Sequence, residues 1–115
     1  MQDSNCLFCR IVAGEIPSRK VYEDSEVLAF EDIHPQAPVH ILVIPKEHFP
    51  TIADVPPERL DLIGRVIGIA NRIAVEKQLD SGYRLVFNCR KDAGQDVFHV
   101  HLHLLGGRKF HWPPG

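Results

Sequence analysis

VFHVHLHLLGGR, residues 97–108, is the stretch around which the rest of the chain is organised. Three histidines alternate there with three aliphatic residues, in the order His99, Val100, His101, Leu102, His103 and Leu104. Strict alternation predicts a β-strand with two unlike faces. The imidazoles are expected on one face, with successive Cα atoms about 6.6–6.8 Å apart, and the aliphatic side chains on the other, in a core. Gly106-Gly107 is expected to end the strand.

Three histidines on one strand face are unusual, because such faces commonly carry Thr, Lys or Glu. Chance enrichment on a half-exposed strand is one explanation. A zinc hydrolase is a second, with a third ligand and an open position for water. The third is that one imidazole attacks an electrophile such as a phosphorus ester or amidate. Such a site needs donors for the phosphate oxygens, which the backbone of 94–96 and the neighbouring Asn88 could supply.

Length and composition limit the class of protein. With 115 residues, 44% hydrophobic and 24% charged, the chain is expected to form one domain over 1–115 with a substantial core. The net charge of −2 gives no electrostatic footprint for nucleic acid or for anionic membranes. No apolar stretch approaches a membrane span, and no signal peptide opens the sequence. Three cysteines suit a reducing compartment, so a cytoplasmic location is expected.

The remaining patterns predict an α+β fold: an antiparallel sheet with one short and one long helix on one face. A short helix is expected over Cys6–Ala13, capped by Asn5. The long helix should run from the Asp54-Val-Pro-Pro signal to about Gln78. The strands expected besides the histidine strand are Val21–Glu23, Val27–Glu31, His40–Ile44 and Tyr83–Asn88. The tail after Gly107 has no periodic signal, and Trp112 in it is expected to dock by its ring.

The long helix carries more apolar surface than one sheet needs to cover. One stripe contains Leu60, Ile63, Ile67, Ala70 and Ala74, and a second contains Leu62, Val66, Ile69 and Ile73. Gly64 and Gly68 lower the helix surface and permit close approach by another element. The pattern therefore favours a two-fold homodimer. The alternative is a helix buried entirely within its own domain.

Cys6-x-x-Cys9 opens the chain on the short helix. Taken alone, the pair is consistent with a redox-active site or with two small buried residues.

His-Val-His-Leu-His-Leu-Leu at 99–105 matches the signature of the histidine-triad (HIT) superfamily. Residues 27–45, VLAFEDIHPQAPVHILVIP, and residues 83–115, ending HWPPG, resemble its histidine-triad nucleotide-binding (Hint) branch. The likeness extends from Cys6 to Gly115, and its separated segments agree in order and spacing.

This resemblance implies a nucleoside phosphoramidase that hydrolyses P–N bonds. His101, the middle histidine, would attack the α-phosphorus of a purine nucleoside phosphoramidate, such as an AMP–amine or AMP–lysine. An adenylyl–His101 intermediate would form, and water would then release AMP without a catalytic cofactor. His99 would orient His101 through its backbone carbonyl, and His103 and His40 would flank the phosphate or complete the histidine network. The alternatives are a dinucleoside polyphosphate hydrolase, against which the HWPPG tail argues, and a nucleotide-binding or scaffolding protein.

The resemblance also implies a nucleotide pocket and a metal site. Asp32 and Ile33 would lie at the ribose, and Phe8, Ile11 and Phe30 around the base. The phosphate and ribose side would be lined by Asn88, Gly94, Gln95 and Val97. Asp96 departs from the animal members, which have Ser there, so the proton donor to the leaving amine is in doubt; Asp96 would instead select a cationic amine. Cys6, Cys9, His48 and His99 would form a closed structural zinc site.

Overall fold

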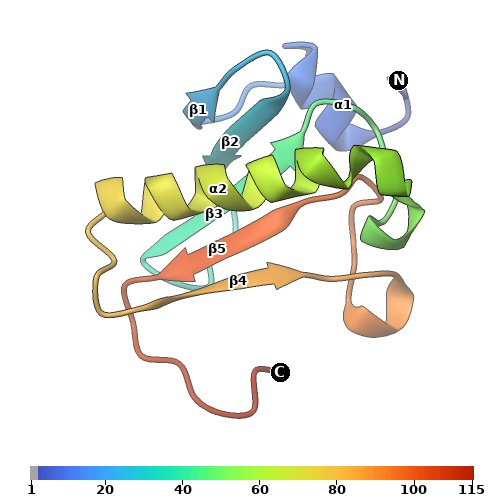
Figure 1. Ribbon diagram of the computed structural model, residues 1–115. Coiled ribbons are helices and arrows are strands. Elements are labelled where there is room, and N and C mark those ends of the chain that lie inside the picture. Colours follow the sequence, from blue (N-terminus) through green and yellow to red (C-terminus); the bar gives the residue numbers. More distant parts are fainter. Residues whose placement is uncertain (1–2) are drawn as a thin grey trace.

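The computed structural model describes residues 3–115, which form one α+β domain around a five-stranded antiparallel sheet. The helices and strands are α1 (Leu7–Val12), β1 (Lys20–Glu23), β2 (Val27–Glu31), β3 (Val39–Pro45), α2 (Leu60–Glu76), β4 (Tyr83–Phe87) and β5 (Leu102–Gly106). The strand order is β1-β2-β3-β5-β4. Figure 1 shows α2 crossing one face of this sheet. The predicted fold class is confirmed, and so are the four strands predicted besides the histidine strand, with ends that shift by at most one residue.

The two helices pack on opposite faces of the sheet, so the prediction that both cover one face was wrong. Val27 and Ala29 of β2 pack in the core beneath α2. Leu28 and Phe30 alternate with them and pack with Phe8 of α1 in a second core. The β2 residues that point to either face of the sheet are apolar, so β2 is buried on both faces. The sheet therefore needs a second covering layer on the face opposite α2.

The histidine strand is shorter than predicted. β5 pairs with β3 and β4 only from Leu102 onward, so His99 and His101 lie in the irregular segment before it. The backbone there is engaged elsewhere: the Val100 N–H donates to the carbonyl of Phe49 at 2.9 Å. The alternation still holds, because Val100, Leu102 and Leu104 are buried in the α2 core while the histidines contact the α1 side.

Helix α2 begins after a 3₁₀ turn over Pro57–Arg59 and ends at Glu76. Its buried residues are Leu62, Ile63, Val66, Ile69, Ala70, Ile73 and Ala74. Leu60 and Ile67, predicted to share a stripe with some of these, are instead exposed, as is Val75. The chain then packs tightly against the end of β5: a Cβ on Gly106 would lie 2.6 Å from Leu79 Cδ1.

Two smaller expectations were also wrong. Cys6, not Asn5, caps α1, because its Sγ accepts the Cys9 N–H at 3.3 Å. Trp112 is 87% exposed and its ring does not dock on the described residues 3–115, whereas Phe110 anchors the tail. Within residues 3–115, none of the helices combines the length and hydropathy required to cross a bilayer.

Candidate active site and metal centre

Sheet register brings the histidines of β3 and β5 to one face. Phe30 pairs with Leu42, and Leu42 pairs with His103. Directly opposed residues in an antiparallel sheet point to the same side, so these three side chains form a row across the α1 face. His40 lies two residues before Leu42 and therefore meets His103 diagonally, with 2.9 Å between His40 Nε2 and His103 Nδ1.

The hydrogen bond of His101 defines its tautomer. Its Nδ1 lies 2.8 Å from the backbone carbonyl oxygen of His99. A carbonyl oxygen only accepts, so Nδ1 carries a proton, and in the neutral ring Nε2 keeps its lone pair. The ring is 5% exposed and packs edge-on against Phe8, with 5.2 Å between the ring centroids. A neutral imidazole held in this way presents a nucleophile of fixed direction.

A second hydrogen-bond chain orients His103. The backbone N–H of Gln36 donates to His40 Nδ1 at 3.0 Å, so neutral His40 carries its proton on Nε2. That proton points at His103 Nδ1, which must accept, and His103 is left with an N–H at Nε2. Burial lowers the pKa of His103 to about 4, helped by the nearby His101 and His40. Burial also lowers the pKa of His40, although Asp32 opposes the shift. Both rings are therefore neutral near pH 7.

Asp32 lies beside this chain, with Oδ2 3.4 Å from His40 Nε2. Its Oδ1 accepts the backbone N–H of His34 at 2.8 Å. Asp32, His40 and His103 are close enough to hold a metal ion. However, His40 could offer Nε2 to a metal only by releasing the N–H of Gln36 from Nδ1. The hydrogen bonding therefore favours a donor chain here over a metal centre.

A cavity of about 470 Å³ opens in front of His101 and His103. Its lining includes nine of the predicted site residues: Phe8, Ile11, Phe30, Asp32, Ile33, Asp96, Val97, His101 and His103. The wall is mostly apolar, as a nucleobase site requires. Its size falls within the usual range for a small-molecule site, about 300–1,000 Å³.

Sequence reasoning missed part of this wall and included residues that lie elsewhere. The lining also contains Leu7, Ile16, Pro17, Ser18, Arg19, Glu31, His34 and Leu42. By contrast, Asn88, Gly94 and Gln95 are not among the described residues that line it. Gln95 is buried, and its amide donates to the carbonyls of Pro50 and Val97 while accepting the Arg90 N–H. Its side chain shapes the loop before the histidines.

The four predicted metal ligands converge on one point. Cys6, Cys9, His48 and His99 each place a ligand atom within 4.8 Å of the other three. His99 Nδ1 lies 3.3 Å from Cys6 Sγ, 3.5 Å from Cys9 Sγ and 3.2 Å from His48 Nδ1. Tetrahedral zinc with ordinary bond lengths separates its ligand atoms by about 3.3–3.8 Å. The spacing of this Cys/His cluster therefore fits a zinc ion.

The surroundings of the Cys/His cluster also fit a metal. His99 Nε2 donates to the carbonyl of Pro45 at 2.7 Å, which leaves Nδ1 unprotonated and aimed at the thiols. Histidine ligands of metals commonly donate their second N–H in this way. Burial lowers the pKa of His99 to about 4 and raises the pKa of the Cys9 thiol to about 11. Metal binding would therefore release a thiol proton but none from His99.

His99 links the Cys/His cluster to His101. Its ring belongs to the Cys/His cluster, while its carbonyl accepts the proton of His101 Nδ1. Helix α1 makes a second link, because Cys6 and Cys9 flank Phe8, which lines the cavity. The Cys/His cluster and the cavity at His101 are thus connected through His99 and through helix α1.

The comparisons with known proteins agree with this geometry. The HIT domain family matches residues 13–110. The 14 kDa zinc-binding protein of Zea mays is 44% identical over 117 residues, which cover 100% of this chain and 91% of the relative.

Solved structures extend the likeness to the fold. A HIT family hydrolase from Legionella pneumophila Philadelphia 1 superposes with a TM-score of 0.94 at 53% identity, covering 96% of this chain and 100% of that one. A histidine triad nucleotide-binding protein from Candida albicans superposes with a TM-score of 0.81 at 33% identity, covering 94% and 82%.

Proposed function

Because the chain belongs to the HIT domain family, we propose that it is a purine nucleoside phosphoramidase of the Hint branch. The observation that carries this proposal is the tautomer of His101: its Nδ1 proton is bound by the His99 carbonyl, and its Nε2 lone pair is free beside a cavity of about 470 Å³. A lone pair at this position suits attack on phosphorus.

The reaction proceeds in two displacements. His101 Nε2 attacks the α-phosphorus of an AMP–amine, the P–N bond to the amine breaks, and the leaving nitrogen takes up a proton. Water then attacks the adenylyl group and breaks its bond to His101, which releases AMP. The His103 Nε2–H donates to a phosphate oxygen, where negative charge develops in both transition states. The Asp32 carboxylate accepts from the ribose hydroxyls, and Phe8, Ile11 and Phe30 enclose the base.

Asp96 lines the same cavity, and its charge acts to raise the pKa of His103. A carboxylate at this position attracts a positively charged leaving group more strongly than a neutral one. We expect substrates whose amine carries a second, cationic nitrogen, such as AMP–lysine, to be preferred for this reason.

The test is AMP release from an AMP–amine, an AMP–lysine and a diadenosine polyphosphate, assayed at equal concentration. We expect kcat/KM for the two phosphoramidates to exceed that for the polyphosphate by at least about tenfold, which is about 1.4 kcal/mol of barrier. Faster cleavage of the polyphosphate would indicate a dinucleoside polyphosphate hydrolase. Tight AMP binding with negligible turnover of all three would indicate a nucleotide-binding or scaffolding protein.

The Cys/His cluster supports a resident zinc ion held by Cys6, Cys9, His48 and His99. A relative is named a zinc-binding protein. With four protein ligands the ion has no open position, so it would supply structural cross-linking of α1 to His99 and His48. The free thiols Cys6, Cys9 and Cys89 further suit a reducing location such as the cytoplasm.

A homodimer through α2 and the edge strand β4 is the assembly that the surface favours. Leu60, Ile67 and Val75 are exposed along one side of α2, and Gly64 and Gly68 on the same side have no atom within 4 Å of an added Cβ. An exposed apolar stripe beside an unpaired strand edge is typical of an interface between copies.

Substitution of Gly68 tests the dimer. Gly68→Arg has room within one chain and removes a poor helix former, which on its own favours the folded chain by up to about 1 kcal/mol. We nevertheless expect it to halve the mass measured by light scattering, because the new side chain blocks the stripe. Glu76→Lys, on the polar side of α2, should leave the mass at two chains. A wild-type mass of one chain, or a dimer that persists in Gly68→Arg, would contradict this interface.

A further inference from the structure

The turn after β5 contacts the loop between β2 and β3, residues 32–38. Arg108 in this turn donates from Nε to the backbone carbonyl of Gln36 at 3.0 Å. One residue earlier, a Cβ on Gly107 would lie 3.0 Å from the Cβ of Pro38, so the two backbones approach closely there. The φ of Gly107 is +89°, a conformation that glycine adopts without a steric cost. The turn therefore holds the loop at two points.

The middle of this loop is weakly anchored from within. Residues 33–36 are exposed, and both prolines of the loop border a cavity of about 120 Å³. The backbone N–H of His34 donates to Asp32 Oδ1 at 2.8 Å, and the side-chain amide of Gln36 donates to the His34 carbonyl at 3.1 Å. Both of these hydrogen bonds join residues only two apart in the sequence. The contacts from the turn after β5 therefore help to determine where Gln36 lies.

The backbone N–H of Gln36 selects one of two proton arrangements of His40 and His103. A single proton lies between His40 Nε2 and His103 Nδ1, which are 2.9 Å apart. If His40 holds this proton, neutral His103 carries its own proton on Nε2. If His103 holds it, the proton of His40 moves to Nδ1, and His103 Nε2 has only a lone pair. Because an N–H only donates, the Gln36 N–H at 3.0 Å from His40 Nδ1 allows only the first arrangement.

This choice decides whether His103 can donate to a phosphate oxygen. In the first arrangement its Nε2–H is a donor, whereas in the second an Nε2 lone pair would face the lone pairs of the oxygen. His103 is among the described residues that line the cavity at His101, and Arg108 and Gln36 are not. Asp32 Oδ2, 3.4 Å from His40 Nε2, also favours the first arrangement. Loss of the Gln36 contact would therefore leave a mixture of the two arrangements.

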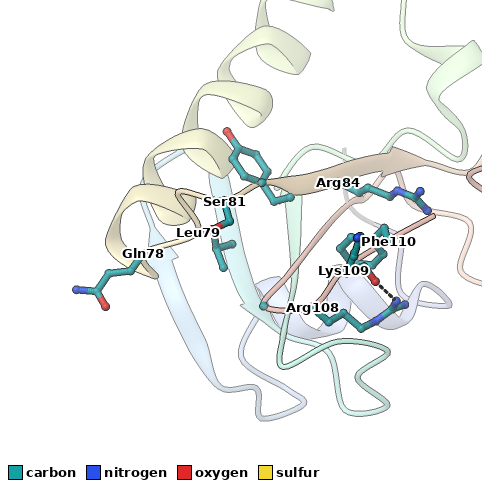
Figure 2. A pocket seen from close by; sticks show the side chains of 10 residues that line it. Gln78, Leu79, Ser81, Arg84, Arg108, Lys109 and Phe110 are labelled. Atoms are coloured by element: carbon teal, nitrogen blue, oxygen red, sulfur yellow. Dashed lines mark hydrogen bonds between the residues drawn. The ribbon is translucent and has the colours of Figure 1, made fainter. Parts of the chain in front are cut away.

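Arg108 is itself held by the C-terminal tail. Its guanidinium carbon lies 4.2 Å from the ring centroid of Phe110, and its Nη1 donates to the carbonyl of Lys109 at 3.2 Å. Figure 2 shows Arg108 and Arg84 beside Phe110, with the hydrogen bond to the Lys109 carbonyl as a dashed line. Arg84 lies over the same ring at 4.9 Å, but its hydrogen bonds go to two carbonyls of the tail. Arg84 thus resembles Arg108 in all but the contact with Gln36.

We propose that Arg108 is a positioning residue for the hydrolysis of the phosphoramidate. It holds the carbonyl of Gln36, and this keeps the Gln36 N–H on His40. That contact maintains the proton on His103 Nε2, where it can donate to a phosphate oxygen in the transition state. The effect of Arg108 on the rate rests on the proposed phosphoramidase function, whereas its effect on the histidine tautomers can be measured without substrate.

The tautomers are measured from the ¹⁵N chemical shifts of the imidazoles, which distinguish ring nitrogens with and without a proton. In the wild type we expect His40 and His103 to be protonated on Nε2 and not on Nδ1. Arg108→Met keeps the length of the side chain but removes its donors, and both rings should then show a mixture of tautomers. His101 should be unchanged, because the His99 carbonyl fixes its Nδ1 proton. Unchanged tautomers of His40 and His103 in Arg108→Met would overturn the proposal.

Steady-state release of AMP from an AMP–amine is the second measurement. We expect Arg108→Met to lower kcat about fivefold, the effect of losing roughly one hydrogen bond, and to leave KM within about twofold. Arg108→Lys keeps a donor for the Gln36 carbonyl and should retain both kcat and the wild-type tautomers, as should the matched control Arg84→Met. Equal loss of kcat in Arg108→Met and Arg84→Met would contradict the role of the Gln36 contact. A wild type that releases no AMP would instead contradict the proposed function, and the tautomers would still test the positioning by Arg108.

Discussion

His101→Ala is expected to lower kcat/KM for AMP release from an AMP–amine by about 10⁴-fold or more, equivalent to roughly 5.5 kcal/mol of barrier. The loss is large because the substitution removes the atom that bonds to phosphorus, and neither neighbour can replace it. The His103 Nε2 carries a proton, and the His99 ring faces the Cys/His cluster and donates to Pro45. Steady-state assay of AMP release measures the effect, and retained AMP affinity would show that the cavity is intact.

Two further measurements separate a nucleophile from a structural histidine. His101→Gly should regain part of its activity when free imidazole is added, because the missing ring can then enter its own space. The wild-type enzyme quenched during turnover should carry an adenylyl group on the peptide that contains His101. His111→Ala, in the exposed tail, is the matched control and should keep wild-type activity. Activity of His101→Ala within tenfold of wild type would overturn the covalent mechanism.

The alternation of residues 99–104 predicted the direction of the side chains well, because side-chain direction depends on local backbone geometry. His99, His101 and His103 do point away from the aliphatic core, even though regular strand pairing begins only at Leu102. The first residue of the strand pairing could not be predicted from the same pattern, because it depends on which group the carbonyl of His99 accepts a hydrogen bond from. That carbonyl is bound by a side chain, His101 Nδ1, and not by a strand.

The position of α1 required information that a single helix does not carry. A helix of six residues that are apolar except for Arg10 fits either face of a sheet. The signal that could have placed α1 lay in the strands. β2 and β3 carry apolar side chains on both faces of the sheet, so another element must cover each face. With α1 on the histidine face, Leu7 and Leu42 join the cavity wall, because Leu42 pairs with both Phe30 and His103.

The loop before the histidines shows the limit of transferring residues by resemblance. Gln95 aligns with a residue expected near the phosphate, yet its amide is spent on three backbone groups. Spacing fixes which residues are near one another along the chain. It does not fix which of their atoms remain free, and that depends on the hydrogen bonds of the folded loop.

Removal of metal is expected to lower the melting temperature by roughly 10–20 °C. A ligand that binds only the folded chain stabilises it by about 4 kcal/mol when its concentration is 1,000 times its Kd, and each kcal/mol shifts the midpoint of a domain of this size by a few degrees. Scanning calorimetry with and without a strong zinc chelator measures the shift. Cys9→Ser should start near the chelated value and respond little to the chelator, whereas Cys89→Ala, outside the Cys/His cluster, should behave as wild type.

Activity after chelation decides between a structural and a catalytic metal. All four side chains of the Cys/His cluster would bind the ion, and His101 is not among them, so folded, metal-free protein should still release AMP. The rate should fall, because His99 positions His101 through its carbonyl and α1 carries Phe8 into the cavity. We expect a several-fold rise in the AMP Kd together with a lower kcat, both of them restored by zinc. Complete loss of activity in a chain that circular dichroism shows to be folded would instead indicate a metallohydrolase and contradict the histidine nucleophile.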